Sequence, residues 1–411
     1  MNTPSSDAAR AAVEMAVRES YGRLIAFLSA RTRDVAAAED ALGEAVVAAL
    51  AKWALEGVPQ VPEAWLLTVA RHHLIDRARR ERTHRRNTAT LEIVAAGSCE
   101  AGPPDPIPDQ RLQLLFVCTH PAIDPDMHTP LMLQTVLGMD AARIARAFLV
   151  SPAAMGQRLA RAKTKIRDAG IAFEIPETRE LPPRLDSVLS AIYAAYGNGW
   201  EDAAGTDPRA RGLAAESIWL ARVLRDCLPD EPEVRGLLAL MLHCEARRHA
   251  RRTPDGRYVP LSEQDPRSWI APMIGEAERE LAAAARMGRP GRFQIEAAIQ
   301  SVYAERCRSG HIEWTAIADF YERLVQLTPS LGARVGRAAA VAEAHGPEAG
   351  LALLEELDHD WVAPYQPYWA VRAHVLRLLK RDDEARQSFD NAIGLAEDEA
   401  VRRFLLQRRN A

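Results

Sequence analysis

The stretch from residue 141 to residue 170, AARIARAFLVSPAAMGQRLARAKTKIRDAG, constrains the fold most, because it predicts two short helices joined by a tight turn. Apolar residues recur at helical spacing before and after an interruption at residues 149–151. Ser151 followed by Pro152 favours a helix start, since the hydroxyl can accept from a free backbone N–H and proline has no N–H to leave unpaired. Gly170 is a typical stop signal.

The second of these helices is basic on its polar face. Six residues precede its first carboxylate, Asp168: Gln157, Arg158, Arg161, Lys163, Lys165 and Arg167. Such a helix fits the major groove of DNA, where glutamine and arginine reach base edges and lysine neutralises phosphates. The alternative is an ordinary amphipathic helix with a solvated basic face.

The composition predicts an all-α fold. Hydrophobic residues make up 48% of the 411 positions, but aromatic residues only 6%, and alternating β-branched runs are scarce. The length allows two or three domains, each with its own core.

Charge is unevenly distributed along the chain. The net charge is -4, with 21 Lys and Arg against 19 Asp and Glu in residues 1–173, and 31 against 37 in residues 174–411. Within the first part, positive charge gathers in the helix just described and in a second expected helix from Pro62, AWLLTVARHHLIDRARRERTHRRN. Local patches rather than totals set the field that a phosphate meets, so both stretches are candidate DNA contacts.

The rest of the first part also favours helices. We expect helices at Ala8–Arg31 and Val35–Leu55, the latter with an acidic exposed side, then a Pro- and Gly-rich linker from Thr88 to Asp109. Shorter helices follow at Arg111–Cys118 and Pro130–Gly138.

A second linker, residues 175–183, precedes helical segments that continue to the end of the chain. The polar excursion from Arg251 to Pro266 interrupts them, and its Asp255-Gly256 pair predicts a tight turn. Ala333, Ala340, Ala349 and Leu353 recur as Trp369, Leu376, Ala385 and Phe389, at about the length of one tetratricopeptide unit. We therefore expect an array of helical pairs, with an aromatic cluster at residues 361–369 in its core.

No catalytic motif was found, so we expect neither an enzyme nor a cofactor or metal site. The five cysteines are scattered without metal-ligand spacing, which indicates a reducing compartment. Neither a signal peptide nor a membrane-spanning run is visible, and a cytoplasmic protein is expected.

Taken together, these motifs resemble an RNA polymerase sigma factor of the extracytoplasmic-function group. AEDALGEAVVAALAKW is similar to the family's region 2, EAWLLTVARHHLIDRARRERTHRR to its strand-melting and minus-10 segment, and RIARAFLVSPAAMGQRLARAKTKIRDAG to its region 4 helix-turn-helix. The resemblance divides the chain into region 2 (8–87), a linker (88–110), region 4 (111–173) and a helical extension (181–411). FVCTHPAIDPD and IRDAGIAFEIP resemble the subgroup that carries a long tetratricopeptide-like extension.

The resemblance implies a set of contacts with core RNA polymerase and promoter DNA. The β′ clamp would be met by Asp40, Leu42, Glu44 and Val46, and the β flap by region 4. The minus-10 element would be met by Arg71, His72, His73, Arg77, Arg79 and Arg80, where His72 replaces the asparagine common in the family. The minus-35 element would be met by Ser151, Gln157, Arg158, Arg161, Lys163 and Lys165.

The extension would supply regulation, through a protein or a small molecule bound to its helical array. A different class of function stays open: an interaction scaffold in which the array is the working part and the front half is a repurposed DNA-binding module. Promoter-dependent transcription with purified polymerase distinguishes the two.

Overall fold

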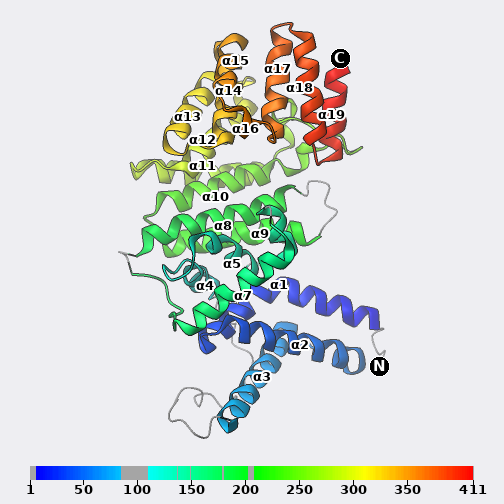
Figure 1. Ribbon diagram of the computed structural model, residues 1–411, viewed down its shortest axis with the longest axis vertical. Helices are drawn as coiled ribbons and strands as arrows, with labels where there is room; N and C mark the ends of the chain where they lie inside the picture. Colours follow the sequence, from blue (N-terminus) through cyan, green and yellow to red (C-terminus); the bar gives the residue numbers. More distant parts are fainter. Residues whose placement is uncertain are drawn as a thin grey trace. The chain divides into compact units, whose positions relative to one another are not determined.

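The computed structural model describes residues 6–84, 110–136, 138–148, 150–177, 180–201 and 208–410. Across these ranges the chain forms nineteen α-helices and three short 3-10 helices, with no strand (Figure 1). The prediction of an all-α fold is confirmed. The helices group into two compact units: residues 1–199 with 212–220, and residues 200–211 with 221–411. The predicted domain boundaries are a functional division and stay a prediction.

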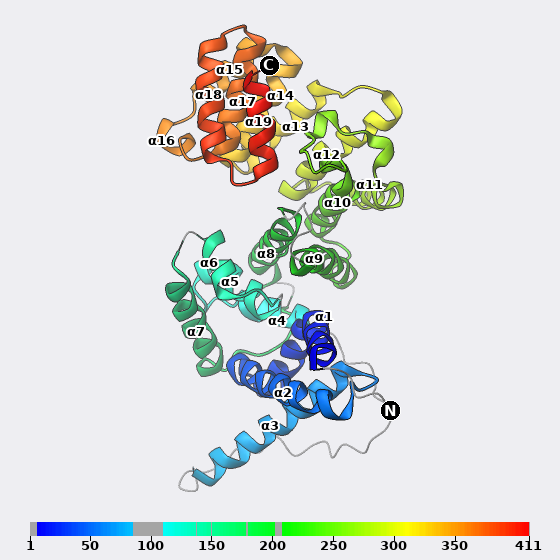
Figure 2. The same cartoon turned by 90° about the vertical axis from the view of Figure 1, so that its right-hand side faces the viewer.

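The first unit begins with three packed helices, α1 (Ser6–Thr32), α2 (Val35–Glu56) and α3 (Pro62–His84). Asp34 caps α2 by accepting from the Ala37 N–H. Trp53, 1% exposed, meets Trp65 edge-on at 5.5 Å between ring centroids and so fixes α3 on α2. Figure 2 shows α3 running out past the other two helices. The linker expected at 88–109 lies outside the described residues.

Four shorter helices follow: α4 (Arg111–Cys118), α5 (Pro125–Thr135), α6 (Ala141–Ala147) and α7 (Pro152–Asp168). The Ser151 hydroxyl accepts from the Ala154 N–H at 3.2 Å, and Gly170 has a φ of +62°, as the start and stop signals predicted. The helix expected from Pro130 instead begins at Pro125, because Asp124 caps it and Pro125 occupies its first turn.

The first unit also contains α8 (Leu181–Glu201) and residues 212–220 of α9 (Pro208–Cys227). The sequence placed Pro182 and Pro183 in a linker, whereas they form the first turn of α8. A proline is tolerated there because the first N–H groups of a helix have no partner within it.

The second unit is built on α10 (Pro232–Ala246), which packs against α11 (Ala271–Arg286) and α12 (Arg292–Ser309). Between α10 and α11 lies the polar excursion, with 3-10 helices η1 (Arg248–Arg251), η2 (Leu261–Glu263) and η3 (Pro266–Ser268). Gly256 has a φ of +84°, and an isolated bridge joins Arg252 to Tyr258. The turn predicted at Asp255-Gly256 is therefore confirmed.

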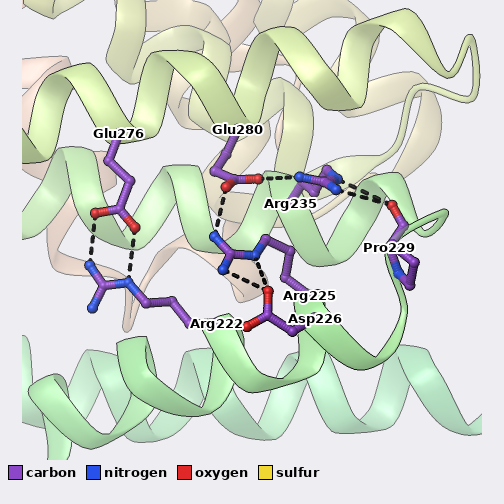
Figure 3. A network of polar contacts seen from close by, with 7 residues as sticks. All are labelled: Arg222, Arg225, Asp226, Pro229, Arg235, Glu276 and Glu280. Carbon is purple, nitrogen blue, oxygen red and sulfur yellow. Dashed lines mark hydrogen bonds and ion pairs between the residues drawn. The ribbon is translucent and has the colours of Figure 1, made fainter.

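A network of ion pairs joins three helices of the second unit (Figure 3). Arg222 of α9 donates to both oxygens of Glu276 at 2.9 and 2.8 Å. Glu280, 8% exposed, accepts from Arg225 at 2.8 Å and from Arg235 at 2.6 Å. Two guanidinium groups thus satisfy one buried carboxylate of α11, which fits a structural role.

The rest of the second unit is an array of helices: α13 (Trp314–Leu327), α14 (Leu331–His345), α15 (Pro347–Glu355), α16 (His359–Val362), α17 (Gln366–Leu378), α18 (Asp382–Leu395) and α19 (Glu399–Asn410). α14 packs with α15, and α17 with α18, at the two repeat copies found in the sequence. The helical pairs are confirmed, while their tetratricopeptide character stays a prediction. Trp361 is 69% exposed, so its expected place in the aromatic core is wrong.

Candidate nucleic-acid interface

The exposed face of α7 carries most of its predicted DNA contacts. Gln157, Arg158, Arg161 and Lys165 are exposed, while the apolar stripe Met155, Leu159, Ala162 and Ile166 is buried. Ser151 is exposed, but its hydroxyl is engaged in capping the helix. Within the described part of the chain, neither Arg158 nor Arg161 forms an ion pair, so both guanidinium groups face water. This face is suited to a polyanion.

Lys163 lies elsewhere, which corrects its expected position at a phosphate. It is 7% exposed, and its Nζ donates to both carboxylate oxygens of Glu39 on α2, at 2.8 and 2.6 Å. The reason is its position on the helix: it stands four residues after Leu159 and three before Ile166, on the buried side. α7 packs against α2 along that side.

The environment of Glu39 opposes its charge. Burial, the largest cause, raises the pKa of the Glu39 carboxyl, although the ammonium of Lys163 acts in the opposite direction. Pairing therefore offsets only part of the cost of removing this carboxylate from water.

The predicted minus-10 residues on α3 differ in exposure and in partners. His72 and Arg79 are exposed, and Arg79 lies 3.8 Å from Asp76 on the same helix. Arg71 is half-buried with its guanidinium 4.8 Å from the centre of the Phe27 ring. The remaining positions are His73, which is half-buried, Arg77, which is exposed and paired with Asp40 at 3.0 Å, and Arg80, whose side chain lies outside the described residues.

The residues expected to contact polymerase also differ in exposure. Asp40 and Glu44 are exposed and Val46 is half-buried, but Leu42 is 2% exposed and packs inside the core. Leu42 therefore supports α2 from within and offers no surface to a partner in this arrangement.

Sequence reasoning missed a set of exposed apolar side chains on α2 and in the loop after it, called here the apolar strip. Its members are Val47, Leu50, Leu55, Val58 and Val61, exposed by 64, 43, 77, 40 and 49%. Large apolar side chains left in water on neighbouring stretches of the chain are candidates for a contact with another protein. For Val47, Leu50 and Leu55 the signal was available, because these residues fall outside the buried stripe of α2.

A second buried cation, Arg111, joins three helices of the first unit. It is 4% exposed, pairs with Glu216 of α9, and lies 4.0 Å from the centre of the Trp219 ring. Its side chain also passes Gly22 of α1, where an added Cβ would come within 3.1 Å of the Arg111 Cδ. The sequence had placed this residue only as the start of an apolar helix.

No cluster of metal-ligating side chains is found among the described residues. No group of three or more His, Cys, Asp and Glu side chains gathers there. Burial raises the pKa of the Cys118 thiol to about 12, which makes it inert. In the same part of the chain, every helix is too short or too polar to cross a bilayer.

Two parts of the chain match models of known protein families. Residues 16–84, which include α2, α3 and most of α1, match the model of sigma-70 region 2. The chain therefore carries a sigma-70 region 2 domain. Residues 184–285 match a family of unknown function, DUF6596.

One related protein aligns with most of the chain. An uncharacterized protein of Rhizobium meliloti (strain 1021) is 38% identical over 369 residues, which span 89% of this chain and 87% of that protein. The chain belongs to the same family as this protein. No solved structure gives a significant match.

Proposed function

We propose that the protein is a sigma factor of the extracytoplasmic-function group, which binds core RNA polymerase and directs it to specific promoters. One observation carries the proposal: a sigma-70 region 2 domain is followed in the chain by a helix pair whose second helix exposes a basic face. Initiation needs one element to hold duplex DNA and another to trap unstacked bases. The two basic surfaces, on α7 and α3, suit these tasks.

On this proposal α2 binds the polymerase β′ clamp. Asp40 and Glu44 supply charge, and the apolar strip from Val47 to Val61 supplies buried area. On α3, His72 is exposed and can both stack on a base and form a hydrogen bond. α6 and α7 act as region 4, with Gln157, Arg158, Arg161 and Lys165 toward the minus-35 element and the β flap nearby.

The extension is proposed to regulate promoter access from the cytoplasm. Support comes from α8 and residues 212–220, which pack in the same compact unit as the sigma region 2 helices. The second unit, with its helical pairs, would be the place for a protein or small-molecule regulator.

A second candidate function is a helical scaffold. The relative aligns over 89% of the chain, which favours a role for the whole protein rather than for the region 2 domain alone. This observation is compatible with a sigma factor and with a scaffold. Binding to purified core polymerase separates them. A sigma factor binds core through α2, and Glu44→Lys together with Val47→Asp weakens that binding. A scaffold does not bind core.

A further inference from the structure

Trp361 of α16 presents its indole to water. Among the described residues of the second unit it is the most exposed large apolar side chain, at 69%, against 53% for Leu327 and 47% for Leu378. Tryptophan offers a large area for burial and is enriched among the residues that dominate protein interfaces. An indole left in water on a folded unit is therefore a candidate contact for a partner.

The single turn of α16 holds this indole in a fixed place. The Asp358 carboxylate caps the turn by accepting from the Asp360 N–H at 2.9 Å. Val362, 1% exposed, packs in a core cluster with residues of α14, α15 and α17. The Ala363 carbonyl then accepts from the indole N–H of Trp369 at 3.1 Å. Because neighbouring residues of a helix point about 100° apart, burial of Val362 directs the preceding indole outward. The exposed indole is therefore preorganised for binding.

The surface around the indole is acidic. Residues 338–371 contain six Asp and Glu residues and no Lys or Arg, although Lys and Arg make up 52 of the 411 residues of the chain. Four of the six acids are exposed and lie within six positions before the indole: Glu355, Glu356, Asp358 and Asp360. No ion pair to these four is found in the described part of the chain, whereas Glu343 on α14 pairs with His374 at 2.9 Å. Their charge is therefore open to a cation from outside.

We propose that Trp361 and these four acids, called here the acidic tryptophan patch, bind a basic segment of another protein, with an arginine stacked on the indole and paired with a carboxylate. Tryptophan is the aromatic side chain that attracts cations best, and the planar guanidinium both stacks on a ring and fits a carboxylate. Nucleic acid is disfavoured, because its phosphates would meet four carboxylates of like charge. The inference rests on the proposed function only in making this partner a regulator of transcription.

The test measures binding of a fluorescein-labelled heptapeptide, in which glycine and arginine alternate, to the full-length chain without polymerase or DNA. Fluorescence anisotropy at low salt should give a dissociation constant below about 1 mM. Trp361→Ala should weaken binding at least about fivefold, because it removes both the ring that attracts the cation and the area to be buried. Citrulline in place of the arginines, which keeps the shape and removes the charge, should weaken binding as much. Glu356→Gln together with Asp360→Asn should lower the affinity and its dependence on salt.

Leu327→Ala and Glu305→Gln are the matched controls. The first removes an exposed apolar side chain of α13, and the second removes an exposed carboxylate of α12, both in the second unit. Each should leave the affinity for the peptide within about twofold. Trp361→Leu keeps an apolar side chain without the aromatic face, and it should lose most of the affinity that Trp361→Ala loses. Because the indole is exposed, both variants should unfold at the temperature of the unaltered chain.

The outcomes separate this inference from the proposed function. The inference is wrong if the peptide does not bind at about 1 mM, if the citrulline peptide binds equally well, or if Trp361→Ala and Leu327→Ala lose the same affinity. Stronger binding of a peptide with glutamate in place of arginine would also overturn it. A chain that binds the peptide as expected but does not bind core polymerase would support the acidic tryptophan patch and remove the sigma-factor proposal.

Discussion

The Nζ of Lys163 donates to both carboxylate oxygens of Glu39, at 2.8 and 2.6 Å, although 124 positions separate the two residues in the chain. The contact ties the basic helix α7 to a helix of the sigma-70 region 2 domain. Lys163 is therefore paired with a carboxylate, whereas several other cations of α7 are exposed to water.

The exposed arginines of α7 are expected to carry duplex recognition. Arg158→Ala and Arg161→Ala should each weaken promoter duplex binding by about 1–3 kcal/mol if they reach base edges. Arg167→Ala is the control, because that guanidinium is paired with Asp168 at 2.9 Å. Binding is measured by titration at two salt concentrations. A change in salt dependence with unchanged sequence preference would reassign the arginines to phosphates.

His72 is expected to contact an unstacked base of the minus-10 element. Because it is exposed on α3, His72→Ala should weaken binding of single-stranded minus-10 DNA by about 1 kcal/mol. His249→Ala, an exposed histidine of the second unit, is the control. Equal losses in the two variants would argue against a role for His72.

Glu216 is expected to stabilise the first unit by pairing with buried Arg111. Glu216→Ala leaves the guanidinium without this carboxylate and should lower the free energy of unfolding by about 1–3 kcal/mol, a reduced value because Glu216 is 32% exposed. Glu180→Ala, whose carboxylate is 63% exposed and pairs with Arg184, should cost well under about 1 kcal/mol. Denaturant unfolding measures both changes. Similar losses would show that the pair of Glu216 with Arg111 contributes no more than an exposed ion pair.

Acid is expected to hold α7 against α2 rather than release it. Burial raises the pKa of the Glu39 carboxyl when α7 packs against α2, so that arrangement takes up a proton more readily than one with Glu39 in water. Its relative stability is therefore gained as the pH falls through the raised pKa and lost as the pH rises. The groups that face Glu39 are Lys163, Asp34, Asp40, Tyr21 and Cys118.

The measurement is the distance between spin labels at the exposed positions Lys52 on α2 and Thr164 on α7, with Cys99, Cys227 and Cys307 replaced by serine, at pH 7 and at pH 5. A shift toward the shorter distance at pH 5, absent in Glu39→Gln, is the expected result. A longer distance at pH 5 would contradict the sign of this dependence.

Local chemistry explains which parts of the fold were predictable. The Ser151-Pro152 start, the Gly170 stop and the Asp255-Gly256 turn depend on neighbouring residues only, and each was found where expected. The start of α5 differs from the expected Pro130, because Asp124 caps the helix and Pro125 occupies its first turn, so that Pro130 lies inside it.

The candidate nucleic-acid interface was harder to predict, because residues that contact each other there are far apart in the sequence. Nothing near Lys163 in the sequence identifies Glu39 as its partner, and the sequence analysis placed Lys163 on the polar face of the helix, whereas it is buried. Leu42 was expected to contact polymerase from the family resemblance, whereas it is 2% exposed and packs inside the core. Arg111 could not be recognised without the fold that brings α9 to it.

Run-off transcription tests the central claim most directly. Purified core polymerase is supplied with the full-length chain and the promoter region upstream of its own gene, with Glu44→Lys/Val47→Asp as the control protein. A discrete transcript that depends on the chain and is lost with the control is the predicted result. No transcript and no binding to core polymerase would contradict the sigma-factor account and favour the helical scaffold.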